Sequence, residues 1–190
     1  MKRAFQIRFL SEMGLKPAHY LVDIGCGTLR GGVPLIEYLE AGHYFGVEVR
    51  QEALEEGRKE LRDAGLASKN PTLLLCPDIS QLTVDRSFDY MWAFSVLIHM
   101  SDEILDHTLG FVSRHLSKDG VFFANVNMGD RREGSWQGFP VVSRTFEFYA
   151  EACARHGLAV TDLGPLRELG HQSEVELHDR QRMLRISRRA

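Results

Sequence analysis

The chain has 190 residues, of which 44% are hydrophobic, so it has the size of one domain and enough apolar content to bury a core. Its 23 Lys and Arg residues nearly balance 26 Asp and Glu, which leaves no overall field favouring nucleic acid or an anionic membrane as a partner. No leader segment or bilayer-length apolar run is visible, and the three cysteines form no C-x-x-C pair, so we expect a cytoplasmic protein with free thiols.

Apolar segments of strand length alternate with segments of helical period, which predicts an α/β fold with a mostly parallel sheet covered on both faces. Seven strands are predicted, in chain order Tyr20 to Ile24, His43 to Val47, Thr72 to Cys76, Phe88 to Phe94, Val121 to Val126, Leu158 to Asp162 and Met183 to Ser187. Helices are predicted at Ala4 to Met13, Val33 to Glu40, Gln51 to Ala64, Asp102 to Leu116 and Thr145 to His156. The segment between Asn127 and Pro140 is predicted to be a loop.

The junction of the first strand with the next helix reads YLVDIGCGTLRGG from Tyr20 to Gly32. Two glycines separated by one residue, Gly25 and Gly27, let the backbone turn sharply and approach a ligand closely. The preceding Asp23 is placed to anchor the loop or a ligand's ammonium group. Arg30 occupies the position of the third glycine in the dinucleotide fingerprint G-x-G-x-x-G, which disfavours a pyrophosphate ligand.

These residues resemble motif I of the class I S-adenosylmethionine (SAM) dependent methyltransferases, an acidic residue followed by G-x-G-x-G. Asp23, Gly25 and Gly27 match, and Leu29 departs in the way of a small-molecule subgroup with the loop D-I-G-C-G-x-L-R-G-G. The resemblance implies one Rossmann-like domain over 1–190, with a helix and lid at 1–19 and a core at 20–190. It also implies SAM as cofactor, S-adenosylhomocysteine as product, and further cofactor contacts from Cys26, Thr28, Leu29 and Arg30.

Acidic residues end the second and third predicted strands, where ligands bind in open parallel sheets. Glu48 lies about twenty residues after the glycine loop, as expected of a carboxylate that accepts both ribose hydroxyls, with Val49 beside it. By the resemblance, Asp78 receives the adenine amino group and Ile79 adjoins it. An acceptor at Asp78 would favour adenine over hypoxanthine, which lacks that donor.

The end of the fourth predicted strand resembles the family segment that lines the methionine moiety and faces the acceptor. Phe94 and Ser95 would touch the cofactor. His99, a few residues on, is a candidate catalytic base, since a neutral imidazole can take a proton from an acceptor hydroxyl or amine. The alternative, that His99 only packs or caps the next helix, stays open at this point.

Two segments are candidates for a lid that excludes water during transfer. One is the N-terminal helix with Phe5, Gln6 and Phe9. The other is the predicted loop 127–140, whose charged and aromatic residues either recognise the substrate or are merely solvated; they are Arg131, Arg132, Glu133, Trp136 and Phe139.

The resemblance implies a SAM-dependent methyltransferase, and the small size of the chain favours a small molecule as acceptor, methylated on oxygen or nitrogen. No [ND]-P-P-[YFW] signature follows the fourth predicted strand, which disfavours amino-methylation of adenine or glutamine. No histidine pair or converging set of oxygen ligands indicates a metal. A SAM-binding module without transferase activity and, with less support, an NAD-dependent oxidoreductase remain as alternatives.

Overall fold

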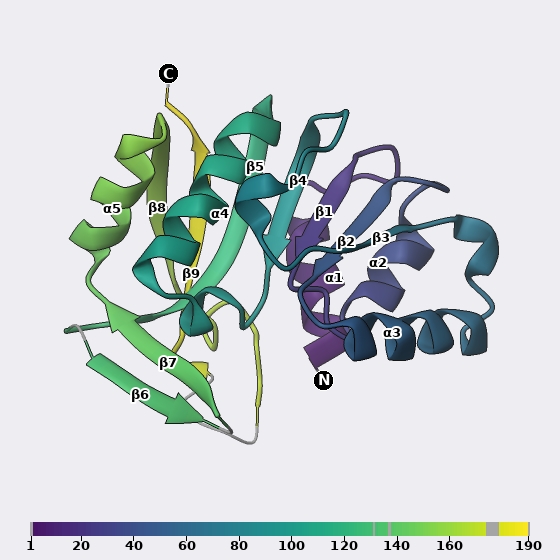
Figure 1. The fold of residues 1–190 in the computed structure, drawn as a ribbon, viewed down its shortest axis with the longest axis horizontal. Coiled ribbons are helices and arrows are strands. Elements are labelled where there is room, and N and C mark those ends of the chain that lie inside the picture. The colour runs from purple at the N-terminus through teal and green to yellow at the C-terminus, as the bar shows by residue number, and fades with distance from the viewer. Residues whose placement is uncertain (1, 131, 137, 174–178, 190) are drawn as a thin grey trace.

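The computed structural model describes residues 2–130, 132–136, 138–173 and 179–189, which build a twisted sheet flanked by helices (Figure 1). The strands are β1 Leu21–Ile24, β2 Tyr44–Glu48, β3 Thr72–Leu75, β4 Phe88–Ala93, β5 Leu116–Met128, β6 Arg132–Trp136, β7 Phe139–Arg144, β8 Leu158–Pro165 and β9 Arg182–Arg188. The helices are α1 Lys2–Glu12, α2 Gly32–Tyr38, α3 Gln51–Asp63, α4 Asp102–His115 and α5 Phe146–Arg155, with short 3-10 turns η1 Ala67–Lys69, η2 Ile79–Gln81 and η3 Leu97–His99.

The central strands lie in the order β3-β2-β1-β4-β5, and β9 then pairs with β5 and β8. The first five strands are parallel to one another, whereas β9 is antiparallel to both of its neighbours. All seven predicted strands and all five predicted helices are therefore present, and the prediction of a mostly parallel α/β sheet is confirmed.

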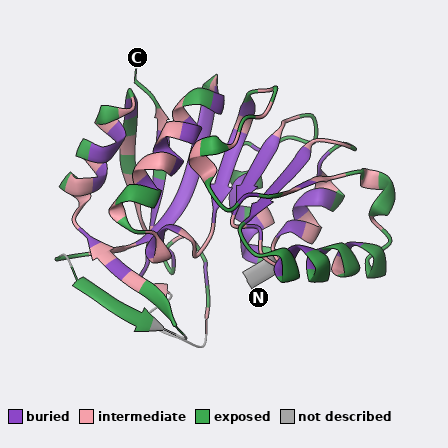
Figure 2. Cartoon of the chain, viewed as in Figure 1, coloured by how far each residue is buried: buried purple, intermediate pink, exposed green. Residues whose placement is uncertain are grey.

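Alternate residues of the central strands face two separate apolar cores, because successive side chains of a strand point to opposite faces. Leu21 belongs to the core under α1, α2 and α3, and its neighbour Val22 belongs to the core under α4 and α5. Strands β1, β2 and β4 are buried almost throughout, whereas the outer face of α3 is exposed (Figure 2). Burial on both faces explains why these strands read as nearly continuous apolar runs.

Capping side chains mark the starts of two helices, and an apolar stripe marks the buried face of a third. Ser101 Oγ accepts the Ile104 amide at 3.2 Å, and Thr145 Oγ1 accepts the Phe148 amide at 3.3 Å, which satisfies free N–H groups at the starts of α4 and α5. In α3 the buried residues recur every three or four positions, so one face packs on the sheet. They are Ala53, Leu54, Gly57 and Leu61.

The prediction of a loop after β5 was wrong, because much of this segment forms the antiparallel hairpin of β6 and β7. Trp136 pairs with Phe139 in this register, and Gly138 in the connecting turn has φ +82°. The described residues of β6 before Trp136 are exposed, so no alternation of apolar and polar residues marked the strand. Residues 118–120, whose Lys-Asp-Gly sequence is typical of a turn, are instead part of β5, which bulges between its pairings of Leu116 with Phe88 and of Val121 with Tyr90.

The hairpin joins the sheet at the carboxyl end of β5, where Asn127 pairs with Ser143 and Met128 with Arg144. It projects beyond the sheet at the edge where the parallel strands end (Figure 1). Among the helices of the described residues, none has the length and apolar character needed to cross a bilayer.

Candidate functional site

The glycine loop after β1 adopts left-handed backbone at every second residue. Gly25, Gly27 and Leu29 have φ of +73°, +55° and +57°. The amides of Gly25 and Cys26 both donate to the Val47 carbonyl, at 2.8 and 3.1 Å, which fixes the loop against β2. A Cβ atom on Gly25 would lie 2.6 Å from Val96 Cγ2, so the loop backbone also approaches the segment after β4 more closely than a side chain would permit.

Leu29 takes the conformation of the missing third glycine, although a left-handed non-glycine residue costs about 1–2 kcal/mol. Its side chain is fully buried and turns away into the core. Gly57 of α3 makes room for it, because a Cβ atom there would lie 3.0 Å from Leu29 Cγ. Any contact of Leu29 with a ligand would therefore involve its backbone.

Glu48, at the end of β2, is 5% exposed and held in one orientation. Its Oε2 accepts the Gly27 amide at 2.9 Å, which joins the carboxylate directly to the glycine loop. Its Oε1 accepts the amides of Val49 and Arg50, both at 3.1 Å, and Arg50 Nε at 3.3 Å. A carboxylate has about four lone-pair positions, so Oε2 retains capacity for a hydroxyl donor.

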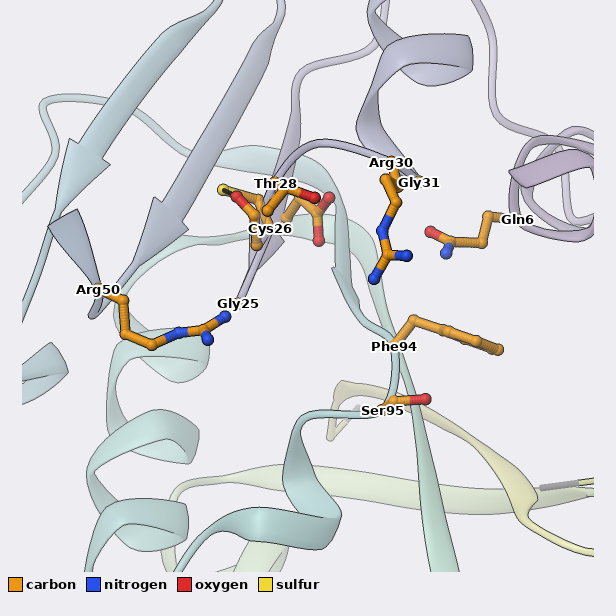
Figure 3. A pocket seen from close by; sticks show the side chains of 11 residues that line it. Gln6, Gly25, Cys26, Thr28, Arg30, Gly31, Arg50, Phe94 and Ser95 are labelled. Atoms are coloured by element: carbon orange, nitrogen blue, oxygen red, sulfur yellow. Dashed lines mark hydrogen bonds between the residues drawn. The ribbon is translucent and has the colours of Figure 1, made fainter. Parts of the chain in front are cut away.

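Two cavities adjoin the glycine loop. The smaller has a volume of about 470 Å³ and is lined by Gln6, Asp23, Gly25, Cys26, Gly27, Thr28, Arg30, Gly31, Arg50, Phe94 and Ser95. The larger has a volume of about 670 Å³, and its walls include Gly25, Gly27, Arg30, Arg50, Phe94 and Ser95 from that set. Because six residues line both, the two cavities are parts of one site. Figure 3 shows the Arg30 guanidinium and the Gln6 amide extending toward the space between the loop and Phe94.

Asp23 is a buried carboxyl group at the base of the smaller cavity. Burial raises its pKa from 3.8 to about 7, and the nearby charge of Glu48 adds to the rise. A hydrogen bond from the Tyr44 hydroxyl to Oδ2, at 2.6 Å, opposes these effects by stabilising the ionised form. Asp23 is therefore poised to lose its proton when a cation enters the smaller cavity.

The larger cavity contains the polar groups that follow β2 and β3. Val49 lines it with 62% of its surface exposed, and Asp78 and Ile79 line it on the side of β3. Asp78 Oδ1 accepts the Ser80 amide at 2.9 Å. Hydrogen bonding with the Ser80 side chain, and then with this amide, keeps the pKa of Asp78 below its ordinary value. An ionised acceptor thus stands at the cavity wall.

His99 has a defined partner across the site. Its Nδ1 lies 2.6 Å from the carbonyl oxygen of Pro140 in β7. A carbonyl only accepts, so Nδ1 carries the proton and a neutral His99 keeps Nε2 as its acceptor. The cap of α4 is Ser101, which removes the capping alternative for His99. His99 lines the larger cavity.

A buried chain of amide groups supports the end of β4 and was not predicted. Ser95 has φ +59°, and its amide donates to Asn125 Oδ1 at 2.7 Å. Asn125 Nδ2 donates to Gln181 Oε1 at 2.6 Å. Gln181 Nε2 donates to Asn127 Oδ1 at 3.2 Å, and Asn127 Nδ2 donates to the carbonyl of Val142 at 3.2 Å. The relay, Asn125-Gln181-Asn127, links the end of β4 to the hairpin. Its sequence signal was the pair of polar residues Asn125 and Asn127 within an apolar strand.

Of the N-terminal residues predicted to belong to a lid, two lie in the core and one lines the site. Phe5 and Phe9 are 3% and 1% exposed and pack in the core, so neither forms a lid surface. Gln6 lines the smaller cavity, and its Oε1 accepts Trp92 Nε1 at 2.8 Å.

In the second lid segment, Phe139 lines the larger cavity, whereas Arg132 and Glu133 are exposed and line neither cavity. Arg131 lies outside the described residues, as does the side chain of Trp136. Arg50, which follows β2, lines both cavities but was not predicted from the sequence as a site residue.

The family model described as a methyltransferase domain matches residues 22–122, more than half of the chain. This chain belongs to that family. The match begins in β1 and ends in β5, so it includes the glycine loop, Glu48, Asp78 and the end of β4. The predictions of a methyltransferase domain and of an enzyme of that class are confirmed at the level of the family.

An uncharacterized protein of Rickettsia prowazekii is 31% identical over 113 residues, which are 56% of this chain and 42% of that protein. The chain thus spans less than half the length of this curated relative.

Among solved structures, a SAM-dependent methyltransferase from Clostridium acetobutylicum has a TM-score of 0.75 at 17% identity, over 99% of this chain and 91% of that chain. The glycopeptide N-methyltransferase MtfA complexed with SAM has a TM-score of 0.74 at 14% identity, over 99% and 94%. Magnesium protoporphyrin IX methyltransferase from Synechocystis with bound SAM has a TM-score of 0.71 at 13% identity, over 99% and 78%. These similarities confirm the predicted Rossmann-like methyltransferase fold, and the bound SAM agrees with the predicted cofactor.

Proposed function

We propose that the protein is a SAM-dependent methyltransferase that moves a methyl group to an oxygen or nitrogen atom of a small molecule. The observation that carries this proposal is the glycine loop, left-handed at residues 25, 27 and 29 and hydrogen-bonded through Gly27 to Glu48. It brings backbone amides and a fixed carboxylate to the wall of one recessed site, as a nucleoside ligand requires.

The two cavities suit the two ends of SAM. In the larger one, Glu48 Oε2 would accept from the ribose, and Val49, Ile79 and Asp78 would surround the adenine. In the smaller one, Asp23 would face the ammonium group and Arg30 the carboxylate, because these are the charged side chains that line it beside Arg50. Cys26, Thr28, Phe94 and Ser95 would complete the cofactor contacts.

SAM supplies an already activated methyl group, so the protein's work is alignment, exclusion of water and removal of a proton. His99 is the proposed base. Its Nδ1–H is held by Pro140, which leaves Nε2 at the larger cavity to take the proton of the acceptor. The buried relay from Asn125 supports the proposal by fixing the backbone of Ser95 between the two cavities.

The small-molecule acceptor, a single methyltransferase domain over 1–190 and a cytoplasmic location are parts of the same proposal. Three unpaired, buried cysteines support a reducing compartment. The solved neighbours named above act on different acceptors, a glycopeptide nitrogen in one case and magnesium protoporphyrin IX in another, so they do not select the acceptor here.

A calorimetric titration with S-adenosylhomocysteine, with NAD as a parallel control, tests the cofactor. We expect binding of S-adenosylhomocysteine in the micromolar range, about −8 kcal/mol, and no heat with NAD. Heat with NAD alone would overturn the proposal in favour of an oxidoreductase. Methyl-labelled SAM and an acceptor screen then separate a transferase from a binding module, because the module binds cofactor normally and labels nothing.

The role of His99 is tested by His99→Gln, which keeps a hydrogen-bond donor but removes the base. We expect cofactor affinity within about twofold of the wild type and turnover reduced about a hundredfold. Unchanged turnover with a methylated acceptor would remove His99 from the mechanism.

A further inference from the structure

Exposed apolar side chains gather at the mouth of the larger cavity. Five large hydrophobic residues of the described chain are exposed, and three of them, Val49, Ile104 and Phe139, line this cavity. Val49 adjoins the carboxylate of Glu48 and belongs with the cofactor in the proposed function. Ile104 and Phe139 come from α4 and β7, and are 48% and 44% exposed. Apolar surface left open at a recessed site indicates a ligand that covers it.

The groups around Phe139 are planar. The His99 ring lies 5.9 Å from the Phe139 ring, tilted by 56°, and the Arg50 guanidinium carbon lies 5.9 Å from the centroid of the same ring. Phenyl, imidazole and guanidinium groups all stack favourably on flat rings. Met100, also at this cavity, adds a polarizable side chain that suits an aromatic neighbour. A flat aromatic ligand therefore matches this mouth better than an aliphatic chain does.

The position of His99 beside this surface also constrains the ligand. His99 Nδ1–H is engaged by Pro140, and the hairpin that supplies Pro140 supplies Phe139 as the adjacent residue. One segment thus orients the imidazole and forms the aromatic wall. A ligand stacked on Phe139 would bring a ring substituent to the proton-accepting Nε2.

We propose that this mouth, formed by Phe139, Ile104, Arg50, Met100 and His99, binds the methyl acceptor, and that the acceptor is a hydroxylated aromatic compound. This inference rests on the proposed methyltransferase function. In the step it serves, the acceptor oxygen forms a bond to the methyl carbon while the carbon–sulfur bond of the sulfonium breaks. Sulfur keeps that electron pair as a neutral thioether, and the hydroxyl proton passes to His99 Nε2.

The test compares two probes of similar shape, 2-naphthol and its saturated analogue decahydro-2-naphthol, on the protein saturated with S-adenosylhomocysteine. Calorimetry should give at least about tenfold tighter binding of 2-naphthol. Phe139→Leu keeps the apolar bulk but removes the ring, so this preference should disappear. Phe139→Tyr should retain it. Met13→Ala shortens an exposed apolar residue that lines neither cavity, so it should leave the affinity for both probes unchanged.

Wild-type protein should also transfer label from methyl-labelled SAM to 2-naphthol, and Phe139→Leu should raise the acceptor KM more than it lowers kcat. Equal binding of the two probes, or an unchanged preference in Phe139→Leu, would overturn the inference while normal binding of S-adenosylhomocysteine leaves the proposed function standing. Failure of the wild type to bind S-adenosylhomocysteine would overturn the proposed function, and this inference with it.

Discussion

The two halves of the site are built differently. On the cofactor side, the conformation comes from a short run of residues, with left-handed backbone at Gly25, Gly27 and Leu29 and one bond to Glu48. On the acceptor side, each group is held by a distant segment: His99 by Pro140, 41 residues away, and Asn125 by Gln181, 56 residues away. A local motif can specify the first half, whereas only the folded sheet assembles the second. Substitutions should therefore separate cofactor binding from acceptor placement.

The largest loss of cofactor affinity is expected from Gly25→Ala, a substitution in the glycine loop. Alanine is strained at φ +73°, and its Cβ would lie 2.6 Å from Val96 Cγ2, so the loop must move away from its place in the proposed cofactor site. We expect the affinity for S-adenosylhomocysteine, measured by calorimetry, to fall about a hundredfold.

Gly42→Ala is the matched control for that substitution. Gly42 has φ +81°, and a Cβ atom there would have no neighbour within 4 Å, so the backbone strain is similar without the clash. The backbone strain should cost each variant about 1–2 kcal/mol of unfolding free energy, the clash should cost Gly25→Ala more, and only Gly25→Ala should lose affinity. Equal losses of affinity would mean that general destabilisation, not the loop, controls binding.

The difference between the two halves also explains which features could be predicted from the sequence and which could not. The strands and helices were predictable because their apolar periods are strong, and Asp23, Glu48 and Asp78 were selected because each lies at or near the carboxyl end of a predicted strand. The hairpin was missed because its exposed strand β6 has no apolar alternation. The amide relay was missed because its partners, Asn125 and Gln181, lie far apart in the sequence and meet only when β9 pairs with β5.

Asn125→Ala is expected to affect the acceptor half more than the cofactor half. It leaves the buried Ser95 amide and the Gln181 side chain without their partner, which should lower the free energy of unfolding by about 2 kcal/mol. Thermal unfolding and labelling assays should show slower methyl transfer, with a smaller rise in the Kd of S-adenosylhomocysteine, to which Ser95 contributes in the proposed function. Asn127→Ala, at the far end of the relay, should have a smaller effect on both unfolding and transfer. A large loss of cofactor affinity in Asn125→Ala would contradict the separation of the two halves.

The affinity for S-adenosylhomocysteine should also depend on pH, because of the carboxyl group of Asp23. Its pKa is raised to about 7, so the carboxyl group is mostly neutral at pH 6 and ionised at pH 8. The ammonium group of S-adenosylhomocysteine prefers the ionised form, so binding should release a proton and the affinity should rise with pH through 7 before levelling. We expect about tenfold tighter binding at pH 8 than at pH 6. Calorimetry with Asp23→Asn should give weaker binding with a flat profile; a persistent slope would assign the titration to another group.

The smallest effect concerns how the loop accommodates Leu29. Alanine normally stabilises a helix interior relative to glycine by about 0.5–1 kcal/mol, and Gly110→Ala in α4 should gain this amount because its nearest side-chain neighbours lie 3.5 Å or more away. Gly57→Ala in α3 should instead lose about 1 kcal/mol, because its Cβ would lie 3.0 Å from Leu29 Cγ and 3.3 Å from the Thr28 backbone. Leu29 is fully buried and held in a left-handed conformation, so its side chain has no space into which to retreat. Chemical denaturation of the two variants should give free-energy changes of opposite sign, with a loss of cofactor affinity in Gly57→Ala only. If both variants are stabilised, Leu29 adapts freely, and the third glycine of the motif is replaced here without help from α3.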